Sequence, residues 1–170
     1  AFDDRAGCAV LCELLREDYA FDVYAAFTAQ EEVGLRGAMV AAYAIDPDVG
    51  FALEGTICDD LPKKKDVSPV TEIGRGPAIT FMDCATIADR GLVKLLVNTA
   101  EREGIPYQFE RATAGGTDAG VMHLTREGVP SVTVSVPARY IHAPVCLLSL
   151  TDFDHTVQLV RETLHALEGG

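Results

Sequence analysis

The chain has 170 residues, 48% of them hydrophobic, which is enough to bury the core of one globular domain. Its 26 acidic and 14 basic residues give a formal net charge of -12, which argues against nucleic-acid binding. No segment reaches the roughly 20 apolar residues of a membrane helix, and the first residues lack the pattern of a signal peptide. The five cysteines are odd in number and show no CxxC spacing. They fit a reducing cytoplasm better than a disulfide framework, and Cys8 and Cys12, one helical turn apart, are expected to pack in the core.

Hydrophobic periodicity predicts alternating helices and strands along the whole chain. In the first half we expect a helix capped by Asp3 or Asp4 and running to about Arg16, a strand over 21–28, a helix over 35–44, a strand over 49–53 and a long loop over 54–77. In the second half we expect a strand over 78–82, a helix over 88–102, a strand over 107–111, a helix after Gly115-Gly116 to about Arg126, a strand over 129–136 and a helix over 151–167.

This alternation predicts the α/β class, as a three-layer sandwich in which helices flank a mostly parallel mixed sheet. No internal repeat or linker divides the chain. In such sheets, ligands bind beyond the carboxyl ends of the strands. The polar residues expected there are Glu31, Glu32, Glu54, Asp83, the turn 115–118 and His142.

Two carboxylate pairs each have a chemical and a structural interpretation. In Glu31-Glu32, one side chain could bind a metal ion while the other acts as a general base, although glutamates are also common at helix starts. In Asp3-Asp4, the alternative to metal binding is helix N-capping. The basic run Lys63-Lys64-Lys65 lies beside Asp59, Asp60 and Asp66 and is typical of a solvated loop.

Two single residues complete the set of candidates. Glu54 follows an apolar strand, which is an unfavourable place for an unpaired charge unless a cation is near. His142 follows the alternating strand 129–136 and so lies near the other candidates. The remaining histidines, His123, His155 and His165, are interpreted as ordinary hydrogen-bonded residues.

Four segments, in this order, resemble the tetrahedral-assembly (TET) family, which includes glutamyl and deblocking aminopeptidases. They are Asp3-Asp4-Arg5-Ala6-Gly7, Gln30-Glu31-Glu32-Val33-Gly34-Leu35-Arg36-Gly37-Ala38, Gly115-Gly116-Thr117-Asp118-Ala119 and Arg139-Tyr140-Ile141-His142-Ala143-Pro144. The resemblance implies a zinc-exopeptidase-like fold and a cytoplasmic, homo-oligomeric enzyme. Such an enzyme removes the N-terminal residue of peptides by means of a water activated by two metal ions.

The resemblance also implies a role for each matching residue. Asp3 would bridge the two metals, with a cis Asp3-Asp4 peptide bond, and Glu31 would be the general base. Glu32 and His142 would bind one ion, and Glu54 the other. The ions would be Zn, Co or Mn, which this donor set does not distinguish. The turn 115–118 would line the substrate end of the site, although Thr117 could equally be a helix cap.

Relatives of this kind carry a further metal-binding histidine upstream of the Asp-Asp-Arg motif. We therefore expect residues 1–170 to be the C-terminal part of a single catalytic domain, without the upstream strands and the inserted β-rich domain. The Asp3, Glu32 and His142 site would then bind one ion well, and the Glu54 site would bind weakly. Two alternatives stay open, namely an inactive metal-binding or assembly fragment and a glycoside hydrolase using the paired carboxylates.

Overall fold

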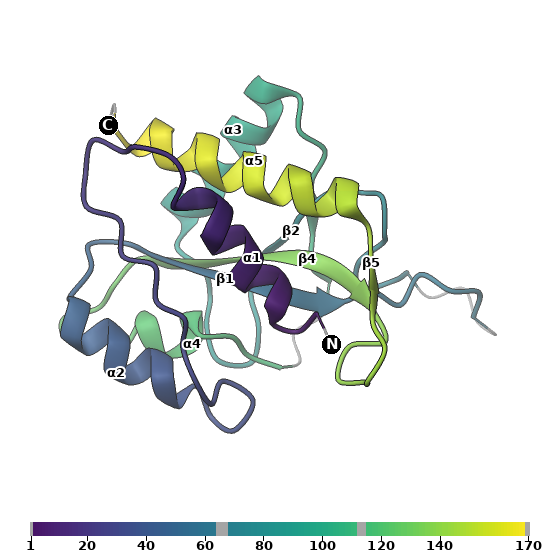
Figure 1. Ribbon diagram of the computed structural model, residues 1–170, viewed down its shortest axis with the longest axis horizontal. Coiled ribbons are helices and arrows are strands. Elements are labelled where there is room, and N and C mark those ends of the chain that lie inside the picture. The colour runs from purple at the N-terminus through teal and green to yellow at the C-terminus, as the bar shows by residue number, and fades with distance from the viewer. Residues whose placement is uncertain (1, 64–67, 112–114, 169–170) are drawn as a thin grey trace.

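The computed structural model describes residues 2–63, 68–111 and 115–168, and it consists of one mixed sheet between two layers of helices (Figure 1). The elements in chain order are α1 (Arg5–Leu14), α2 (Arg36–Ile45), β1 (Gly50–Ile57), β2 (Ala78–Thr80), α3 (Arg90–Glu103), β3 (Gln108–Phe109), α4 (Ala119–Met122), β4 (Ser131–Arg139), β5 (Leu147–Leu148) and α5 (Leu150–Leu167). The predicted three-layer α/β sandwich is confirmed.

The sheet has the strand order β1-β4-β2-β3, with β5 beside β4. The long β1–β4 pair is parallel and aligns Gly50 with Ser131 and Ile57 with Ala138, and β2–β3 is also parallel. The β2–β4 and β4–β5 pairs are antiparallel. Helices α1, α3 and α5 cover one face, and α2 and α4 cover the other (Figure 1). Among the described helices, none combines the length and apolarity needed to cross a bilayer.

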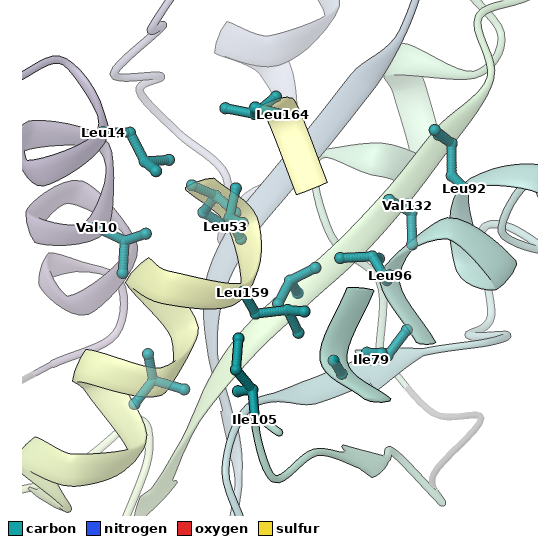
Figure 2. Packing of buried hydrophobic residues seen from close by; sticks show 14 of the residues in the cluster. Val10, Leu14, Leu53, Ile79, Leu92, Leu96, Ile105, Val132, Leu159 and Leu164 are labelled. Atoms are coloured by element: carbon teal, nitrogen blue, oxygen red, sulfur yellow. The ribbon is translucent and has the colours of Figure 1, made fainter. Parts of the chain in front are cut away.

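The hydrophobic core lies between the sheet and the layer formed by α1, α3 and α5 (Figure 2). Val132, Val134 and Val136 point into it from β4, because alternate residues of a strand share a face. Leu96 from α3 and Leu159 from α5 are fully buried against them. The valines alternate with Ser131, Thr133 and Ser135, which lie on the opposite face of the sheet. The two faces therefore differ in character: one is an apolar core and the other is polar.

Helix α1 packs unusually close to β1 at Gly7. A Cβ atom at this position would lie 2.0 Å from the carbonyl oxygen of Leu53, so no larger residue fits without moving the helix or the strand. This contact fixes the start of α1, and with it Asp3 and Asp4, beside the middle of β1.

The strand predicted over 21–28 is wrong. These residues form no strand in the structure, and Phe21, Tyr24 and Phe27 are exposed. A strand needs a neighbour to complete its hydrogen bonds, and among the described residues no strand pairs with this segment. Its β-branched and aromatic composition indicated a strand, but composition does not reveal whether a partner is present.

Three further predictions need correction. Strand β1 continues through Ile57, because β4 pairs with it along its whole length, so Glu54 lies within the strand rather than in a loop. The helix expected after Gly115-Gly116 is reduced to the four residues of α4, and Thr117 does not cap it. The Thr117 hydroxyl instead bonds that of Thr133 at 2.7 Å. All five cysteines are free, but Cys12 is exposed rather than packed in the core.

Asp152, in the first turn of α5, joins this helix to the loop before β2. Its carboxylate is 1% exposed and accepts hydrogen bonds from the backbone amides of Gly74 (2.7 Å) and Gly76 (2.9 Å). Replacing Asp152 with alanine leaves both donors without a partner. We expect the substitution to lower the free energy of unfolding by about 2 to 4 kcal/mol, measured by urea denaturation.

Asp154→Ala is the matched control, because Asp154 is exposed on the same helix. This substitution should change the free energy of unfolding by no more than about 0.5 kcal/mol. Equal effects of the two substitutions would show that the Asp152 carboxylate is not what holds the loop.

Candidate metal centre

Asp3 and Asp4 lie at the N-terminus of α1, where the chain reaches the sheet. Asp4 is the N-cap residue, and its Oδ1 accepts a hydrogen bond from the Gly7 amide at 2.9 Å, so the predicted capping is confirmed for Asp4. The Asp3–Asp4 peptide bond is cis, as the resemblance implied. Asp4 thus has a structural role that Asp3 does not share.

Asp3, Glu32 and His142 form the first group of potential ligands. Nε2 of His142 lies 3.2 Å from Oδ2 of Asp3 and 3.3 Å from Oε2 of Glu32. One ligand atom from each residue can be chosen so that all lie within 4.8 Å of one another. The three residues come from the start of α1, the turn before α2 and the loop after β4, and they are far apart in the sequence.

Local backbone geometry presents Glu32 and His142 to this group. The carbonyl oxygen of Glu31 accepts hydrogen bonds from the amides of Gly34 and Leu35, which closes a tight turn around Glu32. His142 has a φ of 57°, in the left-handed region that few non-glycine residues adopt. Both side chains therefore lie on tight loop segments, Glu32 just before α2 and His142 just after β4.

Asp3, Asp4 and Glu54 form the second group, again with one atom of each within 4.8 Å of the others. Glu54 is 7% exposed and comes from β1, and Asp3 belongs to both groups. The sequence predicted Asp3 and Glu54 here but gave Asp4 no ligand role. The two adjacent aspartates were the sequence feature that could have indicated Asp4 as a ligand. Asp4 was interpreted as a helix cap instead, and it has that role as well.

Unbalanced negative charge is the main electrostatic feature of the centre. Burial, followed by the neighbouring carboxylate of Asp4, raises the pKa of Glu54 to about 9. Burial is also the largest cause for Asp4, whose pKa rises to about 7. The pKa of Asp3 is raised in the same direction, by burial and by Glu32. Carboxylates held this close together favour a cation among them.

Glu31 lies beside both groups but belongs to neither of the groups found among the described residues. Its pKa is raised to about 7, first by burial and then by the negative charge of Asp118. Asp118 accepts a hydrogen bond from the Thr28 hydroxyl at 2.5 Å, and its negative charge also raises the pKa of Glu54. The sequence suggested that the turn containing Asp118 would approach the site, but not this contact with Thr28.

Asp60 and Arg139 tie the loop after β1 to the end of β4, near the segment that carries His142. Nε and Nη2 of Arg139 donate to the two carboxylate oxygens of Asp60 at 2.6 and 2.9 Å. This pairing holds the pKa of Asp60 well below its ordinary value. The pair therefore stabilises the folded state fully above about pH 4, and the contribution is lost as the pH falls below that value.

We expect Asp60→Asn to be less stable than the wild type at neutral pH, with a difference that shrinks as the pH is lowered below about 4. Chemical denaturation at a series of pH values measures this difference. Asp22→Asn, which changes an exposed aspartate, is the control. A difference that is constant with pH would contradict the assignment of the pH dependence to Asp60.

Several other predicted candidates lie outside the centre. Asp83 accepts hydrogen bonds from the amides of Ala85 and Thr86, which stabilise its own turn. Lys63 pairs with Asp59, as expected for a solvated loop, whereas Lys64, Lys65 and Asp66 lie outside the described residues.

The interpretation of the other histidines is right for two of the three. His123 Nδ1 lies 3.0 Å from the carbonyl oxygen of Ala119, and His165 lies beside Glu168. His155 Nδ1 is buried without a hydrogen-bond partner among the described residues. None of the three joins either ligand group found in the described part of the chain.

The donor set fits divalent metal ions. Carboxylate oxygens with one imidazole nitrogen suit Zn, Co or Mn, and the crowded acids would lose their mutual repulsion around a cation. Asp3 lies in both groups, so its two carboxylate oxygens could serve two neighbouring ions. The geometry is therefore compatible with a dinuclear centre.

Comparison with known proteins identifies the family. The sequence profile described as M42 glutamyl aminopeptidase matches residues 1–159. The chain belongs to the M42 glutamyl aminopeptidase family. It is 37% identical over 169 residues to a lysyl aminopeptidase from Pyrococcus furiosus, covering 98% of this chain and 47% of that protein.

Solved structures of M42 relatives have the same fold. A TET aminopeptidase from the marine sediment archaeon Thaumarchaeota archaeon SCGC AB-539-E09 superposes with a TM-score of 0.94 at 41% identity, over 99% of this chain and 48% of that chain. The TET1 peptidase of Pyrococcus horikoshii superposes with a TM-score of 0.76 at 33% identity, over 95% and 47%. The chain thus spans about half the length of the M42 relatives that it matches.

Proposed function

We propose that this protein is a metal-dependent aminopeptidase in which Glu31 is the general base. The observation that carries the proposal is the convergence of two ligand groups on Asp3, with Glu31 beside both. Membership of the M42 family supports it. The metal-binding residues would be Asp3, Glu32 and His142 for one ion, and Asp3, Glu54 and Asp4 for the other.

In amide hydrolysis, residues of this chain would hold the metal ions and transfer the proton. When bound, two divalent ions supply Lewis acidity toward a carbonyl group and lower the pKa of water. The Glu31 carboxylate accepts a proton from the attacking water and returns it to the nitrogen of the leaving amine, so one amide and one water become one carboxylic acid and one amine. The acidic surroundings favour the α-ammonium group of a peptide N-terminus over an acylated, neutral one.

Hydrolysis of paired substrates tests this proposal. Cobalt- or zinc-loaded protein should cleave aminoacyl p-nitroanilides with a free amine, and the N-acetylated counterparts should be cleaved far more slowly. A chelator should stop the reaction, and added metal should restore it. Absence of hydrolysis in the loaded protein, or hydrolysis that resists the chelator, would refute the proposal.

We also propose that the protein works in the cytoplasm as a homo-oligomer. All five cysteines are free, which suits a reducing compartment. The outer surface of α2 exposes Met39, Val40 and Tyr43, and exposed apolar side chains of this kind are typical of protein interfaces. The related TET1 peptidase assembles into a tetrahedron or a large octahedral shell. Light scattering after size-exclusion chromatography would detect the assembly, and a monomer at all concentrations would contradict it.

A further inference from the structure

The sheet face opposite the hydrophobic core carries a second set of polar residues next to the metal centre. The register aligns Glu54 of β1 with Ser135 of β4, and alternate residues of a strand share a face. Thr56 and Thr80 therefore lie on the same face as Ser135. Glu110, just after β3, joins them: its carboxylate accepts hydrogen bonds from the hydroxyls of Thr56 (2.7 Å) and Thr80 (2.6 Å).

We call Thr56, Thr80, Glu110 and Ser135 the polar face. The proposed metal chemistry uses none of these residues, yet two of them have unused hydrogen-bonding capacity. The Ser135 side chain is 1% exposed, and its hydroxyl has no partner among the described residues. Buried hydroxyls are usually hydrogen-bonded, so the Ser135 hydroxyl is free to bond a ligand or a water.

Glu110 can accept further hydrogen bonds. An ionised carboxylate can accept about four hydrogen bonds. The two that Glu110 accepts among the described residues come from neutral hydroxyls, which do not balance its charge. Its side chain also stays partly exposed, whereas Thr56 and Thr80 are 7% and 2% exposed. Glu110 can therefore accept a charged donor from outside the fold.

The polar face lies within reach of a substrate held at the metal centre. Glu54, a proposed ligand, and Thr56 are two residues apart on β1, which places them about 7 Å apart along the same face. Glu110 touches Thr56 directly. The four-carbon stem of a lysine side chain can bridge a separation of this size.

We propose that Glu110 and Ser135 recognise a protonated side chain, such as that of lysine, on the N-terminal residue of the substrate. The inference rests on the proposed function, since it assumes that the substrate backbone lies at the metal centre. The ammonium group would donate to the Glu110 carboxylate and to the Ser135 hydroxyl. A neutral side chain of equal length gains neither bond, and an acidic one is repelled by Glu110.

Equilibrium binding of two amino alcohols to the zinc-loaded protein tests the proposal without depending on catalysis. L-lysinol and L-norleucinol have the same carbon chain, but only lysinol carries the terminal ammonium. Calorimetry should show that the wild type binds lysinol at least about tenfold more tightly than norleucinol, as expected for one charge-assisted hydrogen bond. Glu110→Gln, which can keep a hydrogen bond to a threonine hydroxyl, should bring the ratio close to one and leave norleucinol binding unchanged.

A second variant and a control separate recognition from a structural role. Ser135→Ala removes a hydroxyl that has no partner to lose, so it should fold normally and reduce the preference for lysinol several-fold. Glu103→Gln, on the exposed end of α3, should leave the ratio unchanged. Thermal unfolding of each variant shows whether it is folded.

The possible outcomes distinguish this inference from the proposed function. Equal binding of the two alcohols by the wild type, or a preference that survives in Glu110→Gln, would overturn the role of the polar face even if the protein hydrolyses aminoacyl substrates. Absence of both alcohol binding and hydrolysis would overturn the proposed function as well. A preference that only the two polar-face variants lose would establish the recognition site.

Discussion

Replacing Glu31 with glutamine is expected to abolish hydrolysis while leaving metal binding intact. Glutamine has nearly the same shape but cannot accept a proton from water or return it to the leaving amine. Glu31 belongs to neither ligand group found in the described chain, so its charge is not needed to hold an ion. The loss in kcat should be about 10²- to 10⁴-fold, the usual contribution of a general base. Initial rates on an aminoacyl p-nitroanilide and calorimetric zinc titration measure the two properties separately.

Glu13→Gln is the matched control, because Glu13 is an exposed residue on α1 that pairs only with Arg16 among the described residues. It should retain full activity. If Glu31→Gln keeps its activity, Glu31 is not the base. If it loses zinc together with its activity, Glu31 acts as a ligand rather than as a base.

The elements with complete local signals were predicted well. Helix α3 begins where the Asp89 side chain accepts from the Leu92 amide, and it ends at Gly104, whose φ is 66°. Both boundaries depend on residues within the helix or next to it, so the sequence contains the necessary information. The same holds for β4, where valines alternate with hydroxyl residues along a strand that is buried on both faces.

The errors occurred where distant residues decide the local structure. Segment 21–28 has the composition of a strand, but no described strand is placed beside it. Helix α4 starts only at Ala119, after Thr117 bonds Thr133, and it ends at Met122, before Arg126 takes up a left-handed φ of 51°. The contact with Thr133 cannot be inferred from the residues around Thr117.

In the candidate site, too, the errors concern contacts between distant residues. The order of the motifs and their resemblance to the TET family predicted Asp3, Glu31, Glu32, Glu54 and His142, and the structure brings these residues together. Position after a strand was a correct guide only for His142, because no strand precedes Glu31 and Glu54 lies within β1. Sequence reasoning missed Asp4 as a potential ligand and the contact between Asp118 and Thr28, which are 90 positions apart. Contacts at this separation depend on the folded topology, so no spacing rule reveals them.

Asp3→Asn is expected to weaken both metal sites, whereas His142→Ala should weaken only one. Asp3 belongs to both ligand groups, and asparagine cannot supply the negative charge that a divalent ion requires. His142 belongs only to the group with Asp3 and Glu32, so its removal leaves Asp3, Asp4 and Glu54 in place. Each affected site should lose at least about 10- to 100-fold in zinc affinity, since changes even beyond the ligands themselves cost that much.

Elemental analysis after zinc loading and desalting compares the stoichiometries directly. The wild type should retain more zinc than His142→Ala, and Asp3→Asn should retain least. Asp48→Asn and His165→Ala change exposed or surface-paired residues of the same types and should match the wild type. Equal retention by Asp3→Asn and His142→Ala would mean that Asp3 serves a single ion. Because a shared carboxylate is what joins the two groups into one dinuclear centre, that result would contradict a centre bridged by Asp3.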